Sequence, residues 1–192
     1  MAIGGGNDGQ PLEPHDHAAR VIEPGPRRYP PPLDAYLGLK IKRICHNELV
    51  TNPGAAHFNH CAHFVCHVMR WNHIPGALKC SFLGHHDTPG VHVRVNEVFN
   101  YAPNRTLWVA GAAVPDPCLI VATVAANVIA GPQPSIGTHD RKHLGLHYQG
   151  KIWHFSTSHD QVFADTPHYF RVRKTGDYGK TTVFYSSDLV RT

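Results

Sequence analysis

Residues 143–156, HLGLHYQGKIWHFS, give the clearest indication of the fold. Two runs rich in aliphatic and aromatic residues flank the dipeptide Gln149-Gly150. A two-residue connection that contains glycine is typical of a tight β-hairpin. Because side chains on paired strands can touch across the ladder, we expect that His143 and His154 can meet. The stretch therefore predicts two antiparallel strands that carry polar chemistry.

Upstream of the hairpin, residues 59–69 (NHCAHFVCHVM) predict a helix. Asn59 is a favourable N-cap residue. Apolar side chains then recur at helical spacing, at Cys61, Phe64, Val65, Val68 and Met69. We expect the helix to end before the Pro75-Gly76 break. Cys61 then lies in the first turn, where the helix dipole and the first N–H groups lower the pKa of a thiol.

Further apolar runs complete a mixed fold. Residues 118–125 and 181–186 predict two more strands, and residues 91–102 predict a second helix or a mixed segment. The periodicity of residues 35–50 fits either a helix or a strand. One clear helix followed by several antiparallel strands predicts an α+β fold, with N-terminal helices packed on a central antiparallel sheet.

The 192 residues fit one domain. Residues 1–34 are rich in Gly, Pro and charge, and such a segment buries too little apolar surface to offset its ordering entropy. We therefore expect a flexible arm over residues 1–34 and a folded domain over residues 35–192. Residues 72–117 would form an inserted segment within that domain.

Composition narrows the classes of function. The formal net charge is +4 and no Lys/Arg run is dense, so nucleic acid is not an expected partner. No apolar stretch is long enough for stable membrane insertion. The five cysteines form no CxxC pair, and the first residues lack the features of a signal peptide. We expect a protein that is cytoplasmic when synthesised and that would be secreted, if at all, without a signal peptide.

Cys61 is the candidate nucleophile. A nucleophilic cysteine needs a base within hydrogen-bond reach and a third group that orients the base. His143 and His147 could each supply the base, since they alternate along one predicted strand. His154, on the next strand, is the first candidate for the orienting residue.

Several other side chains stay open as candidates. The alternatives to His154 as the third residue are Asp160, Asp165 and Asn127. The oxyanion would be stabilised by the backbone N–H of Cys61 and by a second donor from the preceding loop, such as Asn59 or His60.

Histidines in the predicted helix permit a second chemistry. His63 and His67 lie four residues apart on one helix face, and His60 adds a third imidazole. Two histidines at this spacing can bind zinc, and the His-His-Asp run at 85–87 could complete a site. The glutamate of the zinc-peptidase motif is missing, since residues 64–66 are Phe, Val and Cys. A His-rich metal-binding domain without catalysis is thus an alternative, while no metal is expected among the catalytic residues.

Three motifs resemble those of the NlpC-type papain-like cysteine peptidases and their amidase relatives. The family's helix motif begins Cys-(Ser/Ala)-x-Phe-Val, and residues 61–65 read Cys-Ala-His-Phe-Val. Its base opens a strand of the type His-(Val/Leu)-Gly-(Ile/Leu)-x-Tyr, and residues 143–148 read His-Leu-Gly-Leu-His-Tyr. Its third polar residue follows in a pattern such as (Ile/Trp)-His-(Ala/Phe)-Ser, and residues 152–156 read Ile-Trp-His-Phe-Ser. The resemblance covers roughly residues 40–160.

The resemblance implies a papain-like fold in which Cys61 is the nucleophile, His143 rather than His147 is the base, and His154 orients the base. It implies hydrolysis of an amide bond without a cofactor, with bacterial cell-wall peptidoglycan as the substrate. An antibacterial effector delivered by a contact-dependent secretion system is one hypothesis, and it would have an immunity protein as a partner.

Two features depart from the peptidase pattern. Asn59 and His60 stand where the peptidases usually carry Asp, and the gap from Cys61 to His143 is longer than in compact peptidases. The helix motif is also similar to the Asn-Cys-x-His-Phe-Val motif of the lecithin–retinol acyltransferase branch, with one residue inserted, although that branch places its His upstream of Cys. A thiol acyltransferase or thioesterase that acts on lipid or acyl substrates is therefore a second hypothesis.

Overall fold

A computed structural model describes residues 32–45, 60–71 and 93–190. Its helices are η1 (Asp34–Tyr36), α1 (Ile41–Ile44), α3 (Cys61–Met69), α4 (Val95–Tyr101), η3 (Ala125–Asn127) and α5 (Pro167–Tyr178). Its strands are β1 (Thr106–Leu107), β2 (Cys118–Val124), β3 (Val128–Ile129), β4 (Ser135–Ile136), β5 (Lys142–Tyr148), β6 (Lys151–Ser156), β7 (Gln161–Asp165) and β8 (Thr182–Ser187). Most of the predicted arm, Asn59 and the run at 85–87 lie outside the described residues.

Six strands form the main sheet in the order β1-β8-β2-β5-β6-β7. All neighbouring pairs in this sheet are antiparallel, and β3 and β4 form a separate two-stranded ladder. The bounds of β2, β5, β6 and β8 agree within one residue with the strands that the sequence predicts. An α+β fold built on an antiparallel sheet is therefore confirmed.

The connection between β5 and β6 has the conformation that its sequence predicts. Gln149 and Gly150 both have positive φ, 53° and 72°, as a two-residue hairpin turn matched to the strand twist requires. The carboxylate of Asp116 accepts hydrogen bonds from both backbone N–H groups, at 3.1 Å and 2.9 Å. The turn is thus fixed by local conformation and by a contact from a distant loop.

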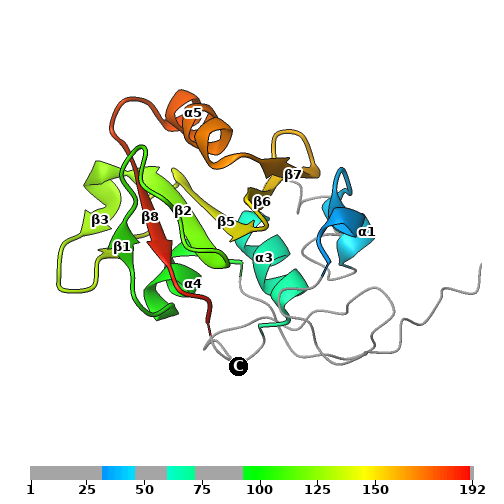
Figure 1. Ribbon diagram of the computed structural model, residues 1–192, viewed down its shortest axis with the longest axis horizontal. Helices are drawn as coiled ribbons and strands as arrows, with labels where there is room; N and C mark the ends of the chain where they lie inside the picture. Colours follow the sequence, from blue (N-terminus) through cyan, green and yellow to red (C-terminus); the bar gives the residue numbers. More distant parts are fainter. Residues whose placement is uncertain (1–31, 46–59, 72–92, 191–192) are drawn as a thin grey trace, which may run out of the picture.

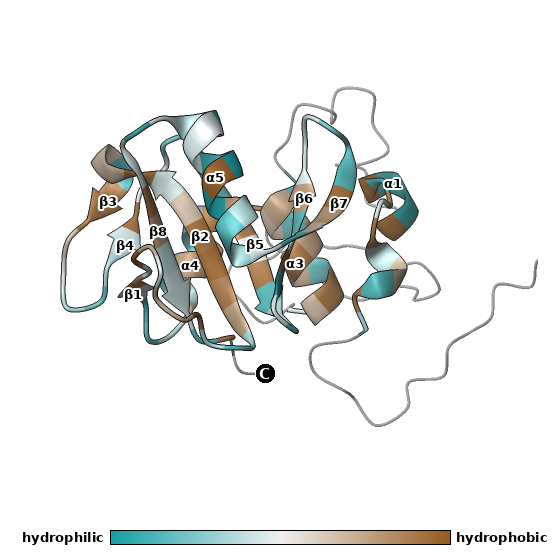
Figure 2. Cartoon of the chain, turned by 45° about the horizontal axis from the view of Figure 1, so that its top comes forward, coloured by the Kyte–Doolittle hydropathy of each residue, from teal (hydrophilic) through white to brown (hydrophobic). Residues whose placement is uncertain are grey.

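Helices cover both faces of the sheet, with α3 and α4 on one face and α5 on the other (Figure 1). The side chains of β2 alternate between two cores. Leu119 and Val121 pack with residues of α3 and α4, while Ile120 and Ala122 pack with Phe170 of α5. A strand buried on both faces reads as a continuous apolar run, and Figure 2 shows β2 hydrophobic over most of its length.

α3 begins at Cys61, which therefore lies in the first turn as predicted, and it ends at Met69, where Arg70 adopts the left-handed conformation. Its N-cap is His60 rather than the predicted Asn59, and His60 makes no side-chain cap hydrogen bond. All nine residues of α3 are buried. The predicted second segment also contains a helix, α4.

β7 and α5 follow the hairpin and were not predicted from the sequence. α5 starts with a favourable cap, because Thr166 Oγ1 accepts a hydrogen bond from Tyr169 N at 3.2 Å and Pro167 occupies the first turn. A threonine followed by proline is a recognised start signal for a helix. The signal was present in the sequence, although α5 has a weak apolar pattern.

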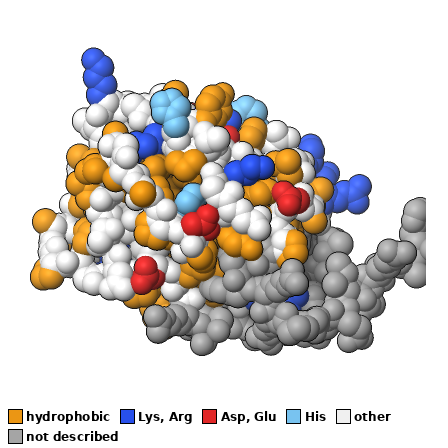
Figure 3. Space-filling model, viewed as in Figure 1, with side chains coloured by type: hydrophobic (Ala, Val, Ile, Leu, Met, Phe, Trp, Pro, Cys, Tyr) orange, Lys and Arg blue, Asp and Glu red, His pale blue; other side chains and the backbone are white. Residues whose placement is uncertain are grey.

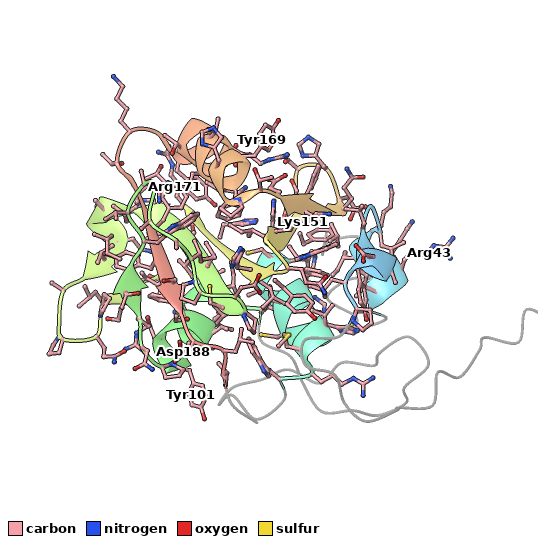
Figure 4. All side chains as sticks on the ribbon, in the orientation of Figure 1. Arg43, Tyr101, Lys151, Tyr169, Arg171 and Asp188 are labelled. Carbon is pink, nitrogen blue, oxygen red and sulfur yellow. The ribbon has the colours of Figure 1, made fainter. Side chains whose placement is uncertain are left out.

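Arg171 connects α5 to the sheet through a hydrogen bond and a ring contact (Figure 4). Its Nη1 donates a hydrogen bond to the carbonyl oxygen of Trp108 at 2.7 Å. Its guanidinium lies 4.2 Å from the centroid of the Phe184 ring, within cation–π range. These contacts fix the helix that carries Arg173 and Lys174, two residues of the site described below.

The core also includes Leu33, two residues before the predicted start of the domain. On the face shown in Figure 3, basic and acidic side chains are scattered among hydrophobic ones. None of the described helices is both long enough and apolar enough to cross a membrane.

Gly145 lies within β5, the first strand of the hairpin, and a side chain there should destabilise the fold. A methyl group at this position would lie 2.6 Å from Ile152 Cγ2 and 3.5 Å from His154 Cβ. We expect Gly145→Ala to lower the free energy of unfolding by about 1–3 kcal/mol, as overpacking does. Urea unfolding measures this change.

Gly176 provides the matched control, because it lies in α5 with no atom near its would-be methyl group. Gly176→Ala should stabilise the protein by about 0.5–1 kcal/mol through helix propensity. Equal effects of the two substitutions would contradict the close approach of β6 to Gly145.

Candidate active site

Cys61 is the first residue of α3 and is fully buried. Its sulfur accepts a hydrogen bond from the backbone N–H of Leu144 on β5, with an N···S distance of 3.4 Å. Helix and strand segments that are 83 residues apart therefore meet at the residue next to His143.

The sulfur contacts β5 where β6 no longer pairs with it. The β5–β6 pairing covers residues 146–148 and 151–153, and it stops before Leu144. β5 remains paired with β2 over its whole first half, including Leu144 with Val121. The start of β5 is therefore held by β2 but not by β6, and the N-terminus of α3 lies against it.

His143 and His154 meet across the hairpin, as the sequence predicts. Nε2 of His143 lies 3.0 Å from Nδ1 of His154, and both rings are buried. The two ring centroids lie 6.0 Å and 5.1 Å from that of Phe170 on α5. The pair therefore faces α5, on the opposite side of the sheet from α3.

Asp165, at the end of β7, lies behind His154. Its Oδ2 is 3.0 Å from Nε2 of His154. Arg173 of α5 holds the same carboxylate, with Nε 3.0 Å from Oδ2 and Nη2 donating to Oδ1 at 3.2 Å. Burial alone would raise the pKa of Asp165, but the hydrogen bonds and charges of His154 and Arg173 outweigh burial and lower this pKa.

His143, His154 and Asp165 form a row of hydrogen-bonded groups. This row determines which ring nitrogen of His143 carries the proton. An ionised Asp165 can only accept, so Nε2–H of His154 donates to it and Nδ1 of a neutral His154 accepts. Nε2–H of His143 then donates to that Nδ1. The network thus assigns His143 the tautomer whose Nδ1 carries the lone pair. Nδ1 is the nitrogen that can take up a proton.

α3 and the His143 ring lie on opposite faces of the sheet, and the Cys61 sulfur at the start of α3 reaches the backbone N–H of Leu144. The described contacts join the Cys61 sulfur to the N–H of Leu144 and the His143 ring to His154, and no hydrogen bond between thiol and imidazole is among them. The positive charge of Lys174, a buried residue of α5, acts on both groups. This charge favours the ionised form of Cys61 and the neutral form of His143.

Burial decides the charge state of both reactive groups. Burial raises the pKa of Cys61 to about 11, although the Leu144 N–H and the charge of Lys174 lower it. The helix start predicts the opposite direction, so desolvation outweighs the helix terminus here. Burial, with the charges of Lys174 and neighbouring residues, holds the pKa of His143 well below 6.5. At neutral pH the site holds a neutral thiol and a neutral imidazole.

Of the two predicted oxyanion residues, only His60 is described. Its Nδ1 lies 3.2 Å from Nδ1 of His63, so its side chain is engaged with that residue. The first backbone N–H groups of any helix lack intrahelical acceptors. At the start of α3, the backbone N–H groups of Cys61 and Ala62 lie near the Cys61 sulfur.

The alternatives left open by the sequence have other contacts. His147 Nδ1 donates to the carbonyl oxygen of Pro115 at 2.7 Å. Asp160 is exposed and lies 3.6 Å from the amino group of Lys40. Asn127, at the end of η3, donates from Nδ2 to Oγ1 of Thr123 on β2 at 2.9 Å. Among the three alternatives to His154, only Asp165 joins the row, and it acts behind His154 rather than in its place.

A third possible metal ligand, which the sequence did not indicate, lies beside the predicted pair His63 and His67. His63 and His67 lie close to the thiol of Cys45, which directly follows α1. His60 lies beside His63 but outside this group of three.

Sequence analysis missed the contribution of α5. Arg173 and Lys174 belong to the basic run at 171–174, to which the sequence analysis assigned no helix or strand. The Thr-Pro start signal at 166–167 could have predicted a helix. Nothing local indicates that this helix packs on the sheet beside His143.

No protein family, curated protein or solved structure matches this chain.

Proposed function

We propose that this chain is a cysteine-nucleophile hydrolase with a papain-like, NlpC-type fold that cleaves an amide bond. The observation that carries the proposal is the junction at the start of β5. There the sulfur of a helix-start cysteine accepts a hydrogen bond from Leu144, and the neighbouring His143 begins a row of hydrogen bonds that ends at Asp165.

The reaction would proceed as two acyl transfers. Nδ1 of His143 takes the thiol proton while Sγ of Cys61 attacks the amide carbonyl carbon. The backbone N–H of Cys61 stabilises the oxyanion. His143 then returns the proton to the leaving amine, which leaves a thioester on Cys61. Water, activated by the same imidazole, hydrolyses the thioester and restores the thiol.

The row behind His143 stabilises its transient positive charge. As His143 gains a proton, its Nε2–H bond to His154 strengthens, and the ionised Asp165 balances the charge through His154. Catalytic hydrogen bonds are often long in free enzymes and tighten when substrate binds. We therefore propose that substrate draws the thiol and Nδ1 of His143 together at the start of β5.

The proposed substrate is an amide in the peptide stem of bacterial peptidoglycan, by resemblance of the three motifs. The lipid alternative uses the same thiol on an ester. Purified peptidoglycan and a phospholipid or acyl-thioester substrate, each incubated with the protein, separate the two. New free amines and the matching mass losses in wall fragments are expected. Turnover of the acyl substrate alone would favour the acyltransferase branch.

The charge states of the site predict an unusual pH profile. The reactive form has neutral Cys61 and neutral His143. It is lost as the pH falls through the lowered pKa of His143, below 6.5, and as the pH rises toward about 11, where Cys61 ionises. The measured kcat/KM should therefore fall only in acid and stay level up to about pH 9.

A thiolate–imidazolium resting pair would behave differently. It would lose activity between about pH 8 and pH 9, as its imidazolium deprotonates. An alkaline limb in that range would contradict the neutral resting state.

A further inference from the structure

A second cluster of reactive side chains lies beside α3, away from the junction with β5. It consists of Cys45, His63 and His67, and one ligand atom from each lies within 4.8 Å of the other two. All three residues are buried, with exposed fractions of 0%, 0% and 3%. None of them takes part in the hydrolysis proposed above.

Local geometry brings the three side chains together. His63 and His67 are one helical turn apart on α3, with ring centroids 5.9 Å apart. Cys45 follows α1, which lies beside α3 on the side away from α4 (Figures 1 and 2). The cluster therefore joins two segments through three soft or borderline donors.

We propose that Cys45, His63 and His67 bind one zinc ion. Thiolate and imidazole are the ligands that Zn²⁺ prefers, and three such ligands with one further position make a common zinc site. At zinc bond lengths, tetrahedral ligand atoms lie about 3.4–3.7 Å from one another. Atoms that lie within 4.8 Å need to close by about 1 Å, which small side-chain rotations provide.

A neighbouring histidine supports the assignment. Zinc-bound histidines almost always use their second ring nitrogen for an outer hydrogen bond, which fixes the tautomer. Nδ1 of His63 lies 3.2 Å from Nδ1 of His60, so Nε2 of His63 is the nitrogen that faces an ion. His60 would then position a ligand rather than bind the metal.

The site has a structural consequence for α3. Zinc at this position would tie the end of α1 to the helix that begins with Cys61. Binding releases the thiol proton of Cys45 and ties the ion's binding energy to the folded state. Because Cys61 is not a ligand, the zinc site and the proposed nucleophile are separable by substitution.

The first experiment uses the whole purified protein with zinc chloride alone, then with cobalt chloride. Elemental analysis after dialysis should find one zinc per chain. Cobalt should give a thiolate-to-metal charge-transfer band, because one ligand is a cysteine. Zinc should also raise the thermal unfolding temperature, by an amount that grows with the logarithm of its concentration. Absence of both zinc retention and the cobalt band would overturn the proposal.

Substitutions then identify the ligands. Cys45→Ser should abolish the cobalt band, and His67→Gln should lower zinc affinity at least tenfold. Cys118→Ser is the matched control, since Cys118 is a buried thiol in the other core, and it should keep both signals. Cys61→Ala should keep the zinc while it loses hydrolysis. Loss of the band in Cys61→Ala but not in Cys45→Ser would overturn the assignment.

Two further outcomes are decisive. If Cys45→Ser fails to fold, chelation of the wild-type protein replaces it: a fall in unfolding temperature that zinc reverses supports the site, and no fall overturns it. Retention of Cu⁺ without retention of Zn²⁺ overturns the zinc assignment, since two histidines and a thiolate also suit copper.

Discussion

Replacing Cys61 with Ala should abolish amide hydrolysis, with kcat lower by about 10⁵-fold or more, while the fold is retained. Alanine removes Sγ, the atom on which the acyl group would be carried. In the structure the change costs one weak acceptor for the N–H of Leu144. The rest of α3 stays anchored by its buried apolar side chains. Release of free amines from wall fragments at saturating substrate measures kcat.

Cys66 provides the matched control for this prediction. It is a buried cysteine on the same helix, five residues further along, and it is not part of the proposed site. Cys66→Ala should keep kcat within about threefold of wild type, since Cys66 lies outside the proposed hydrolytic site. Full activity in Cys61→Ala would refute the cysteine mechanism. Mass spectrometry of the acylated peptide should place the trapped acyl group on residue 61.

The parts of this fold that sequence predicts are those fixed by local rules. The β5–β6 hairpin follows from two apolar runs and a turn whose residues accept positive φ. The start of α3 at Cys61 follows from helical spacing of apolar residues. The contact between His143 and His154 then follows from strand pairing. None of these needs knowledge of distant segments.

The parts that sequence could not predict depend on distant segments. Whether the helix terminus or desolvation controls the Cys61 thiol is decided by how deeply it is buried, and burial is a property of the whole packed chain. The sequence left Asp165 as one of several candidates for the third residue. Its contact with Arg173 depends on how α5 packs, which no local pattern indicates. Cys45 joined His63 and His67 only through the packing of α1 against α3.

The two buried sites give α3 a contact at each side. Its first residue, Cys61, contacts the start of β5, which does not pair with β6. Its residues His63 and His67 lie close to Cys45. A helix held at its N-terminus and along one face has little freedom to rotate. If zinc binds there and Cys61 is the nucleophile, as proposed, removal of zinc should reduce hydrolysis indirectly, through the placement of α3.

The second large effect is expected at His143. His143→Gln should lower kcat by about 10⁴-fold or more, because an amide side chain cannot accept the thiol proton. Glutamine can still donate a hydrogen bond to Nδ1 of His154, which limits the structural damage. The residual rate should also lose its fall in acid, since that fall reports protonation of His143. Measurement of kcat/KM against pH tests both effects.

His147 is the matched control, because it lies on the same strand and the same face of the sheet, four residues away. His147→Gln can keep its hydrogen bond to the carbonyl oxygen of Pro115, so both kcat and the acid limb should be preserved. If instead His147→Gln were inactive and His143→Gln active, the base would be His147. In that case the row from His143 through His154 to Asp165 would only stabilise the fold, and a different route for the thiol proton would be needed.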